Sequence, residues 1–338
     1  MELKDLKNKN IHIVGISGAE GSAIAEFLVN QGAEHITGHD FCENKDFKRS
    51  FNLYHDWMTS KERKKVFEEL KKLPIKFRFK DYYLIDVHKA DLIFVPQSWF
   101  RYKINEKLKR LAGKIPFSSI TKLYFQLCPC PIIGITGTSG KSTTTRLIYE
   151  ILERGRTKGQ VYFSGNDRQN VQVLNQVPKM KLEDVLVLEI SNRQLIIDLE
   201  RSPYISVITN ISPNHLDDHK GDYKNYINTK KKILKYQTGK DFAVLNNDNS
   251  ITRKFSKECK SQAFLFSRKK KLEEGAYIEK DRLFLRKNNK EYIICSRKDL
   301  KIPGPHNIEN ALAASLACFL FGINTKIIRE TLPQFSGL

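Results

Sequence analysis

The run GITGTSGKSTTT (residues 134–145) combines the glycines, hydroxyls and lysine of a phosphate-binding loop. It departs from the usual P-loop spacing G-x-x-x-x-G-K-[ST], because Ile135 stands where the first glycine belongs. The chemistry survives this departure, since Gly137 and Gly140 let backbone N–H groups face a phosphate and Lys141 adds a positive charge. The predicted nucleotide-phosphate residues are Gly137, Thr138, Ser139, Gly140, Lys141, Ser142 and Thr143.

A single carboxylate, Glu189, ends the apolar run VLVLE (185–189), which reads as a strand. Open parallel sheets bind ligands outside the carboxyl ends of their strands, so Glu189 should lie near the glycine loop. Carboxylate and hydroxyl oxygens suit Mg²⁺, and Glu189 and Ser142 are the expected ligands. The alternative is that Glu189 is an ordinary surface glutamate.

Two series of alternating strands and helices are predicted to position these residues. The first series begins with a strand (IHIVG), a glycine turn and a helix that ends at Gly32. It continues with a strand that ends at Asp40, a helix over 59–73 capped by Ser60 or Thr59, and the buried strand 90–96. This alternation predicts a parallel sheet in an α/β fold.

The second series begins near Pro129. It contains the strand PIIGIT, the glycine loop, the helix 142–155, three further strands (DVLVLEIS, YISVITNIS, DFAVLNNDN), short alternating strands within 264–302 and a last helix over 307–322. We therefore predict a Rossmann-like domain (1–125) followed by a P-loop domain (126–338) with a mainly parallel sheet and a small β-rich excursion. The linker is expected around Ser118–Pro131.

The first glycine turn is a weaker signal. Its G-x-x-G-x-x-G spacing after a strand, with Asp40 further along, is typical of a dinucleotide site. Glu20 would be unfavourable beside a diphosphate unless its side chain points away. The residues concerned are Ser17, Gly18, Gly21, Ser22 and Asp40.

Four more motifs follow the glycine loop in order. They are LEISNRQL (188–195), ITNISPNHLDDH (208–219), YINTKKKIL (226–234) and IPGPHNIENALAA (302–314). With GTSGKSTT they resemble the Mur ligase superfamily, the ATP-dependent ligases that add amino acids to UDP-N-acetylmuramic acid in peptidoglycan synthesis. Within it, the motifs are most similar to those of the D-glutamate-adding members. The resemblance covers nearly the whole chain.

The resemblance implies that ATP activates a substrate carboxylate as an acyl phosphate, which an incoming amine attacks. The implied substrates are UDP-N-acetylmuramoyl-L-alanine and D-glutamate. It implies two Mg²⁺ ions, with His215 as a second metal ligand and Lys230 carbamylated by CO₂ to give an anionic ligand. From composition alone, Lys230 belongs to the solvated charge run TKKKILK. The implied catalytic set is Lys141, Glu189, His215 and Lys230.

The same resemblance assigns binding roles. Asn307 and Asn310 would recognise adenine. The alternative for Asn307 is that it is the N-cap of the last helix. In this family the first glycine turn receives the UDP of the sugar nucleotide. Asn166, Ser191 and Gln194 are the further substrate-binding candidates.

Several positions depart from the family pattern. Asn214 replaces the usual aspartate before the metal histidine, and Asn192 and Arg193 replace the usual Ser-Phe. The ending LPQFSGL resembles the sequence that normally leads into a third, C-terminal domain, which binds the incoming amino acid. We therefore expect that domain to be absent and ligation by these 338 residues to be weak.

Bulk composition limits the alternatives. The net charge of +20 comes from dispersed lysine runs without interleaved aromatics, which favours a solvated basic surface over nucleic-acid binding. No apolar run approaches the roughly 18 residues of a membrane helix, and the N-terminus has no signal-peptide core, so a cytoplasmic location is expected. The six cysteines are expected to be reduced and structural, because the spacing of Cys128 and Cys130 does not suit zinc. The sequence does not indicate the oligomeric state.

Three alternatives stay open. Another amide ligase of the superfamily, of the L-alanine-adding or folylpolyglutamate type, would differ in its acceptor. A non-catalytic module would bind ATP or UDP-sugar without forming an acyl phosphate. A nucleic-acid-dependent ATPase would respond to polynucleotides.

Overall fold

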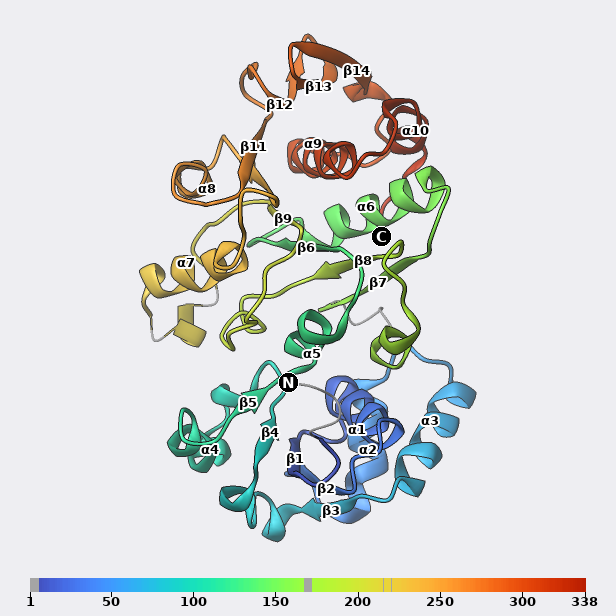
Figure 1. Cartoon of the computed structure of the whole chain (residues 1–338), viewed down its shortest axis with the longest axis vertical. Coiled ribbons are helices and arrows are strands. Elements are labelled where there is room, and N and C mark those ends of the chain that lie inside the picture. Colours follow the sequence, from blue (N-terminus) through green and yellow to red (C-terminus); the bar gives the residue numbers. More distant parts are fainter. Residues whose placement is uncertain (1–5, 167–171, 215, 220) are drawn as a thin grey trace. The chain divides into compact units, whose positions relative to one another are not determined.

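The computed structural model describes residues 6–166, 172–214, 216–219 and 221–338 (Figure 1). The chain forms two compact units. The first comprises Met1–Leu127 and Arg168–Pro178, and the second comprises Cys128–Asp167 and Lys179–Leu338. In the described ranges, no helix has the length and apolarity needed to cross a membrane.

The first unit contains a five-stranded parallel sheet in the order β3-β2-β1-β4-β5. Its strands are β1 (Asn10–Val14), β2 (His35–Asp40), β3 (Lys76–Phe79), β4 (Leu92–Phe94) and β5 (Phe117–Ser118). Its helices are α1 (Ala19–Asn30), α2 (Phe47–Tyr54), α3 (Ser60–Lys72), α4 (Glu106–Leu111) and α5 (Ile120–Leu127). The strand order reverses between β1 and β4, and such a switch point is where open α/β sheets form their ligand crevice.

Helix α3 shows how local chemistry sets an element boundary. The Thr59 hydroxyl accepts a hydrogen bond from the Glu62 backbone N–H at 3.3 Å, and the Glu62 carboxylate accepts one from the Thr59 N–H at 3.0 Å. This reciprocal capping box makes Thr59, not Ser60, the N-cap. Phe67 and Leu70 are buried on the apolar stripe that the sequence predicts.

The boundary between the two units lies between Leu127 and Cys128, within the predicted linker range, although part of that range is helical. Residues 120–127 form α5, with Ile120, Leu123, Tyr124 and Phe125 buried. These apolar side chains recur at helical spacing and therefore pack as an element of the first unit. The Cys-Pro-Cys-Pro sequence that follows is a turn signal, and it marks both the end of this helix and the beginning of the second unit.

The second unit contains a nine-stranded sheet in the order β14-β13-β12-β11-β10-β9-β6-β8-β7. Its strands are β6 (Ile132–Thr136), β7 (Val161–Gly165), β8 (Val185–Glu189), β9 (Ile205–Ile208), β10 (Phe242–Asn246), β11 (Gln262–Ser267), β12 (Gly275–Glu279), β13 (Arg282–Lys287) and β14 (Lys290–Ser296). The pairing is parallel from β7 to β12, while β12, β13 and β14 pair antiparallel. The α/β fold class and the β-rich excursion are confirmed.

The helices of the second unit are α6 (Lys141–Gly155), α7 (Tyr223–Lys231), α8 (Ser250–Phe255), α9 (Pro305–Leu320) and α10 (Thr325–Thr331). Helices α6 and α9 pack against each other, as Figure 1 shows. Leu147, Ile148 and Ile151 of α6 are fully buried, and Ala313, Ala314 and Ala317 of α9 are too. Small alanines let the two helices approach closely, which brings the beginning of α9 to the beginning of α6.

Candidate functional site

The glycine loop joins β6 to α6, as its sequence predicts. Gly140 has a φ of +79°, and a β-carbon there would lie 2.2 Å from Asn310 Oδ1. A β-carbon at Gly137 would lie 1.9 Å from Thr209 Oγ1. Glycine is therefore required at both positions, by conformation and by space.

The residues after β9 fix the shape of this loop. Asn210 accepts a hydrogen bond from the Ser139 N–H at 3.1 Å through its side chain and from the Thr138 N–H at 2.8 Å through its backbone oxygen. The Thr209 hydroxyl donates to the Ser139 carbonyl oxygen at 2.6 Å. Because these two amides are already engaged, the amides available to an anion are those of the first turn of α6, where Ser142 and Thr143 lie half-buried.

Lys141 and Glu189 come to the same edge because β6 and β8 are neighbours. Glu189 pairs in register with Ile135, two residues before Gly137. The Lys141 ammonium donates to the Thr138 carbonyl oxygen at 3.3 Å. Burial lowers the pKa of Lys141, and the negative charge of Glu189 opposes that shift.

Glu189 has the character of a cation ligand. It is 2% exposed, and its Oε1 accepts a hydrogen bond from Asn166 Nδ2 at 3.2 Å. Its Oε2 is buried and has no hydrogen-bond partner among the described residues. A buried carboxylate oxygen without a partner is costly, and a divalent cation would satisfy it. The donors present therefore fit Mg²⁺, which Asn166 would support by orienting the carboxylate.

Lys230 of α7 reaches the loop from the other side of β6. It is 1% exposed, its Nζ donates to the Gly137 carbonyl oxygen at 2.8 Å, and it lies 5.0 Å from the Tyr226 ring centroid. Burial and the charge of Lys141 lower the pKa of Lys230 to about 7, against the opposing effect of Glu189. The structure thus brings Lys141, Glu189 and Lys230 within electrostatic reach of one another.

His215 lies outside the described residues. Nearby, His219 is buried, its Nε2 lies 3.2 Å from Asn192 Nδ2, and burial lowers its pKa. Arg193 donates to Asp218 at 2.7 Å. Asn192 and Arg193, two of the three residues that depart from the family pattern, therefore have partners in the 216–219 segment. Across the described ranges, no group of three or more His, Cys, Asp and Glu side chains forms a metal cluster.

Ser191 and Gln194 form a closed turn after β8. The Ser191 N–H donates to Gln194 Oε1 at 2.9 Å, the Gln194 N–H donates to Ser191 Oγ at 3.2 Å, and both residues are buried. These contacts position the end of β8.

Asn310 is part of the loop support. It is 3% exposed, its Oδ1 accepts from Thr144 Oγ1 at 3.3 Å, and its Nδ2 donates to Asn307 Oδ1 at 3.0 Å. The N-cap role for Asn307 is wrong, because α9 begins at Pro305 and Gly304 is its N-cap. A cavity of about 560 Å³ adjoins this helix start, and its charged lining residues are Arg268, Lys280, Arg297 and Asp281, the last two forming an ion pair at 3.1 Å.

In the first unit, the residues predicted to bind the sugar nucleotide mainly stabilise the glycine turn to which they belong. Asp40 is 1% exposed and accepts from the Ser17 N–H at 3.0 Å and the Ser17 hydroxyl at 2.5 Å. A β-carbon at Gly21 would lie 2.2 Å from the Gly15 carbonyl oxygen, so this glycine allows α1 to approach the turn. Glu20 accepts from the Gln97 N–H at 3.0 Å, which fixes the carboxylate on a neighbouring loop.

Aromatic side chains that the sequence motifs did not predict as a site gather beyond the end of β2. Phe41 and Tyr102 are each 42% exposed, with ring centroids 5.8 Å apart, and Tyr83 contacts Phe41 edge-on at 6.3 Å. Exposed aromatic faces at a switch point offer stacking surfaces for a flat ring. Phe41 directly follows Asp40, which was the available signal.

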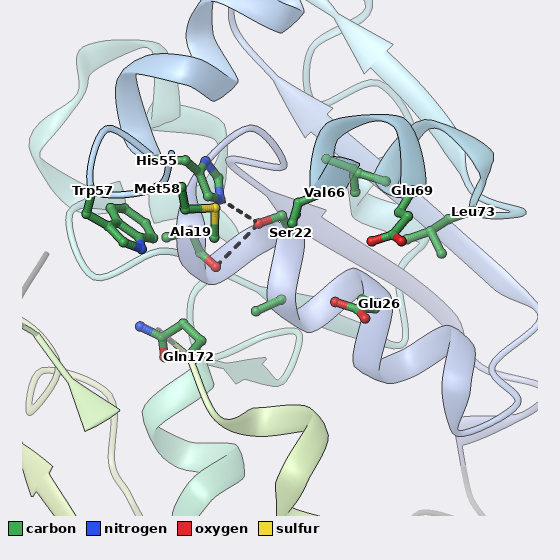
Figure 2. Close-up of a pocket in the computed structure, with 12 residues that line it drawn as sticks. Ala19, Ser22, Glu26, His55, Trp57, Met58, Val66, Glu69, Leu73 and Gln172 are labelled. Atoms are coloured by element: carbon green, nitrogen blue, oxygen red, sulfur yellow. Dashed lines mark hydrogen bonds between the residues drawn. The ribbon is translucent and has the colours of Figure 1, made fainter. Parts of the chain in front are cut away.

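A separate cavity of about 150 Å³ lies between α1 and α3 (Figure 2). Ser22 contributes to its wall, and its hydroxyl lies 3.2 Å from His55 Nε2. The other lining side chains are mainly apolar and include Glu26 and Glu69, and the described residues place no lysine or arginine in this wall. The cavity is therefore unsuited to a diphosphate.

The missed residues at the glycine loop are Thr209, Asn210 and Tyr226. Tyr226 lies with its hydroxyl 2.9 Å from Thr138 Oγ1. Their sequence signal was slight: a Thr-Asn pair after an apolar strand and a tyrosine four residues before Lys230.

Comparison with known proteins adds a family match. Residues 135–318 match the Mur ligase middle domain. The chain is 35% identical over 335 residues to UDP-N-acetylmuramoylalanine–D-glutamate ligase of Acetivibrio thermocellus, covering 99% of this chain and 66% of the relative. It is 36% identical to the ligase of the same name from Caldanaerobacter subterraneus subsp. tengcongensis, covering 99% and 68%. The chain thus spans about two thirds of the length of these relatives.

Solved structures support the fold. UDP-N-acetylmuramate:L-alanyl-γ-D-glutamyl-meso-diaminopimelate ligase from Neisseria meningitides superposes with a TM-score of 0.59 at 18% identity, over 98% of this chain and 99% of that one. UDP-N-acetylmuramate–alanine ligase from Thermotoga maritima gives a TM-score of 0.55 at 22% identity, over 98% and 69%. At these identities the likeness concerns the fold alone.

Proposed function

The chain belongs to the Mur ligase family, and from that premise we propose that it is an ATP-dependent amide ligase that joins D-glutamate to UDP-N-acetylmuramoyl-L-alanine. The names of its most similar relatives support this choice of substrates. Since ATP is the energy source, we also propose that the reaction takes place in the cytoplasm.

One observation carries the proposal: Lys141, Glu189 and Lys230 gather around the glycine loop at the carboxyl ends of β6 and β8. An oxygen of the substrate carboxylate would bond to the γ-phosphorus of ATP, and the bond from that phosphorus to the bridging oxygen would break, releasing ADP. The glutamate nitrogen would then attack the acyl carbon, lose a proton and expel phosphate. Lys141 and the first-turn amides of α6 would neutralise the transferring phosphoryl group.

Bound Mg²⁺ would offset the charge of the phosphates and align them. We propose Ser142 and Glu189 as its ligands, with His215 and carbamylated Lys230 at a second ion. Among the described residues, support comes from the unpartnered Glu189 oxygen.

The carbamate proposal follows from the burial of Lys230. With a pKa of about 7, a large fraction of this side chain is a neutral amine at physiological pH. A neutral amine adds to CO₂ and releases one proton, which gives a carbamate anion. The product would exchange an unfavourable buried cation for an anion beside the metal site.

We propose that the two nucleobases, adenine and uracil, bind away from the glycine loop. Asn307 and the cavity beside it would receive adenine, and Asn310 would hold Gly140 in position. In the first unit, the uracil would stack on Phe41 and Tyr102, with Ser17 and Gly18 near the diphosphate.

The test is formation of the activated acid. Incubation with ATP, Mg²⁺, UDP-N-acetylmuramoyl-L-alanine and hydroxylamine should release ADP and trap the acyl phosphate as a hydroxamate. Parallel reactions with UDP-N-acetylmuramate or a folate should give none. A hydroxamate from one of those acids instead would indicate another ligase of the family. ATP binding without ADP release or hydroxamate would indicate a non-catalytic module.

A further inference from the structure

Two thiols outside the nucleotide site lie in direct contact. The sulfur atoms of Cys128 and Cys130 are 3.2 Å apart, and the residues are 2% and 5% exposed. They begin the second unit, immediately before β6. Closing the remaining gap to the roughly 2.05 Å of a disulfide requires a shift of only about 1 Å.

The local sequence explains why the thiols meet. Pro129 separates the two cysteines, Pro131 follows them, and the backbone bends at Cys130. Proline fixes its own φ and restricts the residue before it, so few conformations remain. Cys128 Sγ also contacts the Cys130 carbonyl oxygen at 3.7 Å and Met180 Sδ at 3.8 Å, which keeps it on the side facing Cys130.

The two thiols differ in acidity. A hydrogen bond from Cys130 lowers the pKa of Cys128, and the charge of Arg201 adds to this shift. The pKa of Cys130 is raised by the same hydrogen bond and by burial. Thiol oxidation begins at a thiolate, so Cys128 is the thiol that reacts first and Cys130 is the resolving thiol.

We propose that Cys128 and Cys130 are a modification site that forms a reversible intramolecular disulfide with a small hydroperoxide as the oxidant. The Cys128 thiolate attacks the terminal peroxide oxygen and the O–O bond breaks, which gives a sulfenic acid and releases hydroxide from hydrogen peroxide or an alkoxide from an alkyl hydroperoxide. The Cys130 sulfur then bonds to the Cys128 sulfur, the sulfenic oxygen leaves, and the Cys130 proton completes a molecule of water. Two thiols are oxidised by two electrons and one peroxide is reduced. Because both sulfurs are buried, only a small oxidant is suitable.

Oxidation with hydrogen peroxide, followed by alkylation in denaturant and trypsin digestion, tests this inference. Residues 123–141 form one tryptic peptide with two cysteines, because lysines occupy positions 122 and 141 and none lies between. In the oxidised protein this peptide should be unalkylated and lighter by two hydrogen atoms. Dithiothreitol should restore two alkylated thiols. The readout does not depend on ligase activity, so it is independent of the proposed function.

Matched controls lie within the chain. The Cys259→Ser variant should leave the disulfide unchanged, whereas Cys128→Ser and Cys130→Ser should each abolish it. Cys318 is fully buried and donates to the Ile148 carbonyl oxygen at 3.8 Å, so it should stay reduced. The inference fails if the 123–141 peptide keeps both thiols when the half-buried Cys259 is already oxidised. Three other results would also overturn the inference. They are sulfinic acid at Cys128, a disulfide between two chains, and a bound soft metal ion that keeps both thiols from oxidation.

Discussion

The Lys230 ammonium donates a 2.8 Å hydrogen bond to the carbonyl oxygen of Gly137, across 93 residues of sequence. This contact places a buried lysine on the residue that opens the phosphate loop. It gives Lys230 a structural role in holding the loop, while burial and the charge of Lys141 lower its pKa and so favour the neutral amine that the carbamate proposal needs.

Replacing Lys230 by methionine tests the pKa assignment. Because the native pKa is about 7 and the ordinary value is 10.5, the unfolded state binds more protons between these pH values. The free energy of unfolding of the wild type should therefore rise, relative to Lys230→Met, as the pH increases from 7 to 10. Urea denaturation followed by circular dichroism at several pH values measures the difference. A constant difference across that window would contradict the assignment.

Replacing Gly140 by alanine should damage the phosphate loop. The new β-carbon would meet Asn310 Oδ1 at 2.2 Å, at a φ of +79° that disfavours side chains. We expect a stability loss of about 1–3 kcal/mol and at least a tenfold weaker affinity for MgATP. Gly239→Ala is the matched control, since nothing lies within 4 Å of its β-carbon. Equal behaviour of the two variants in calorimetric titration with MgATP would exclude a constrained loop.

Replacing Glu189 by glutamine should weaken the dependence of nucleotide binding on Mg²⁺. The substitution keeps the volume but removes the charge of the buried, unpartnered oxygen. We expect ATP affinity with Mg²⁺ to fall at least tenfold, about 1.4 kcal/mol, while affinity in EDTA changes little. Glu183→Gln, an exposed residue before the same strand, should bind MgATP like the wild type. An unchanged response to Mg²⁺ in Glu189→Gln would remove Glu189 from the proposed metal site.

The buried histidine pair should make the first unit sensitive to acid. Leu84 N–H donates to His39 Nδ1 at 3.2 Å, so His39 Nε2 carries the proton and donates to His12 Nδ1 at 2.8 Å. Burial lowers the pKa of His12 to about 4 and that of His39 to about 3. The unfolded state therefore takes up protons first, and the free energy of unfolding should fall as the pH drops from 6.5 to 4, by up to about 1.4 kcal/mol per pH unit for each ring.

Tryptophan fluorescence can follow this transition, because Trp57 and Trp99 are the two tryptophans and both belong to the first unit. A His12→Gln/His39→Gln double variant should be less stable near neutral pH but show a shallower acid dependence. If its stability falls as steeply as that of the wild type between pH 6.5 and 4, other groups dominate the acid response.

Features whose chemistry is local could be predicted from the amino-acid sequence. The strand, glycines and Lys141 of the phosphate loop lie within one short segment, and Thr59 with Glu62 sets the start of α3 within four residues. The apolar run that ends at Glu189 likewise predicts a carboxylate at a strand end. Such features follow from spacing along the chain.

Tertiary structure alone decided which distant residues hold that loop. Thr209 and Asn210 reach it because β9 is the neighbour of β6, and Asn310 reaches Gly140 because the alanines of α9 let it approach α6. Tyr226 contacts Thr138, and Lys230 is buried although its lysine run predicts a solvated side chain. Both observations have the same origin. Strand order and helix packing set these contacts. Periodicity along the chain cannot predict them, because it specifies which face of an element is apolar but not which other element will cover that face.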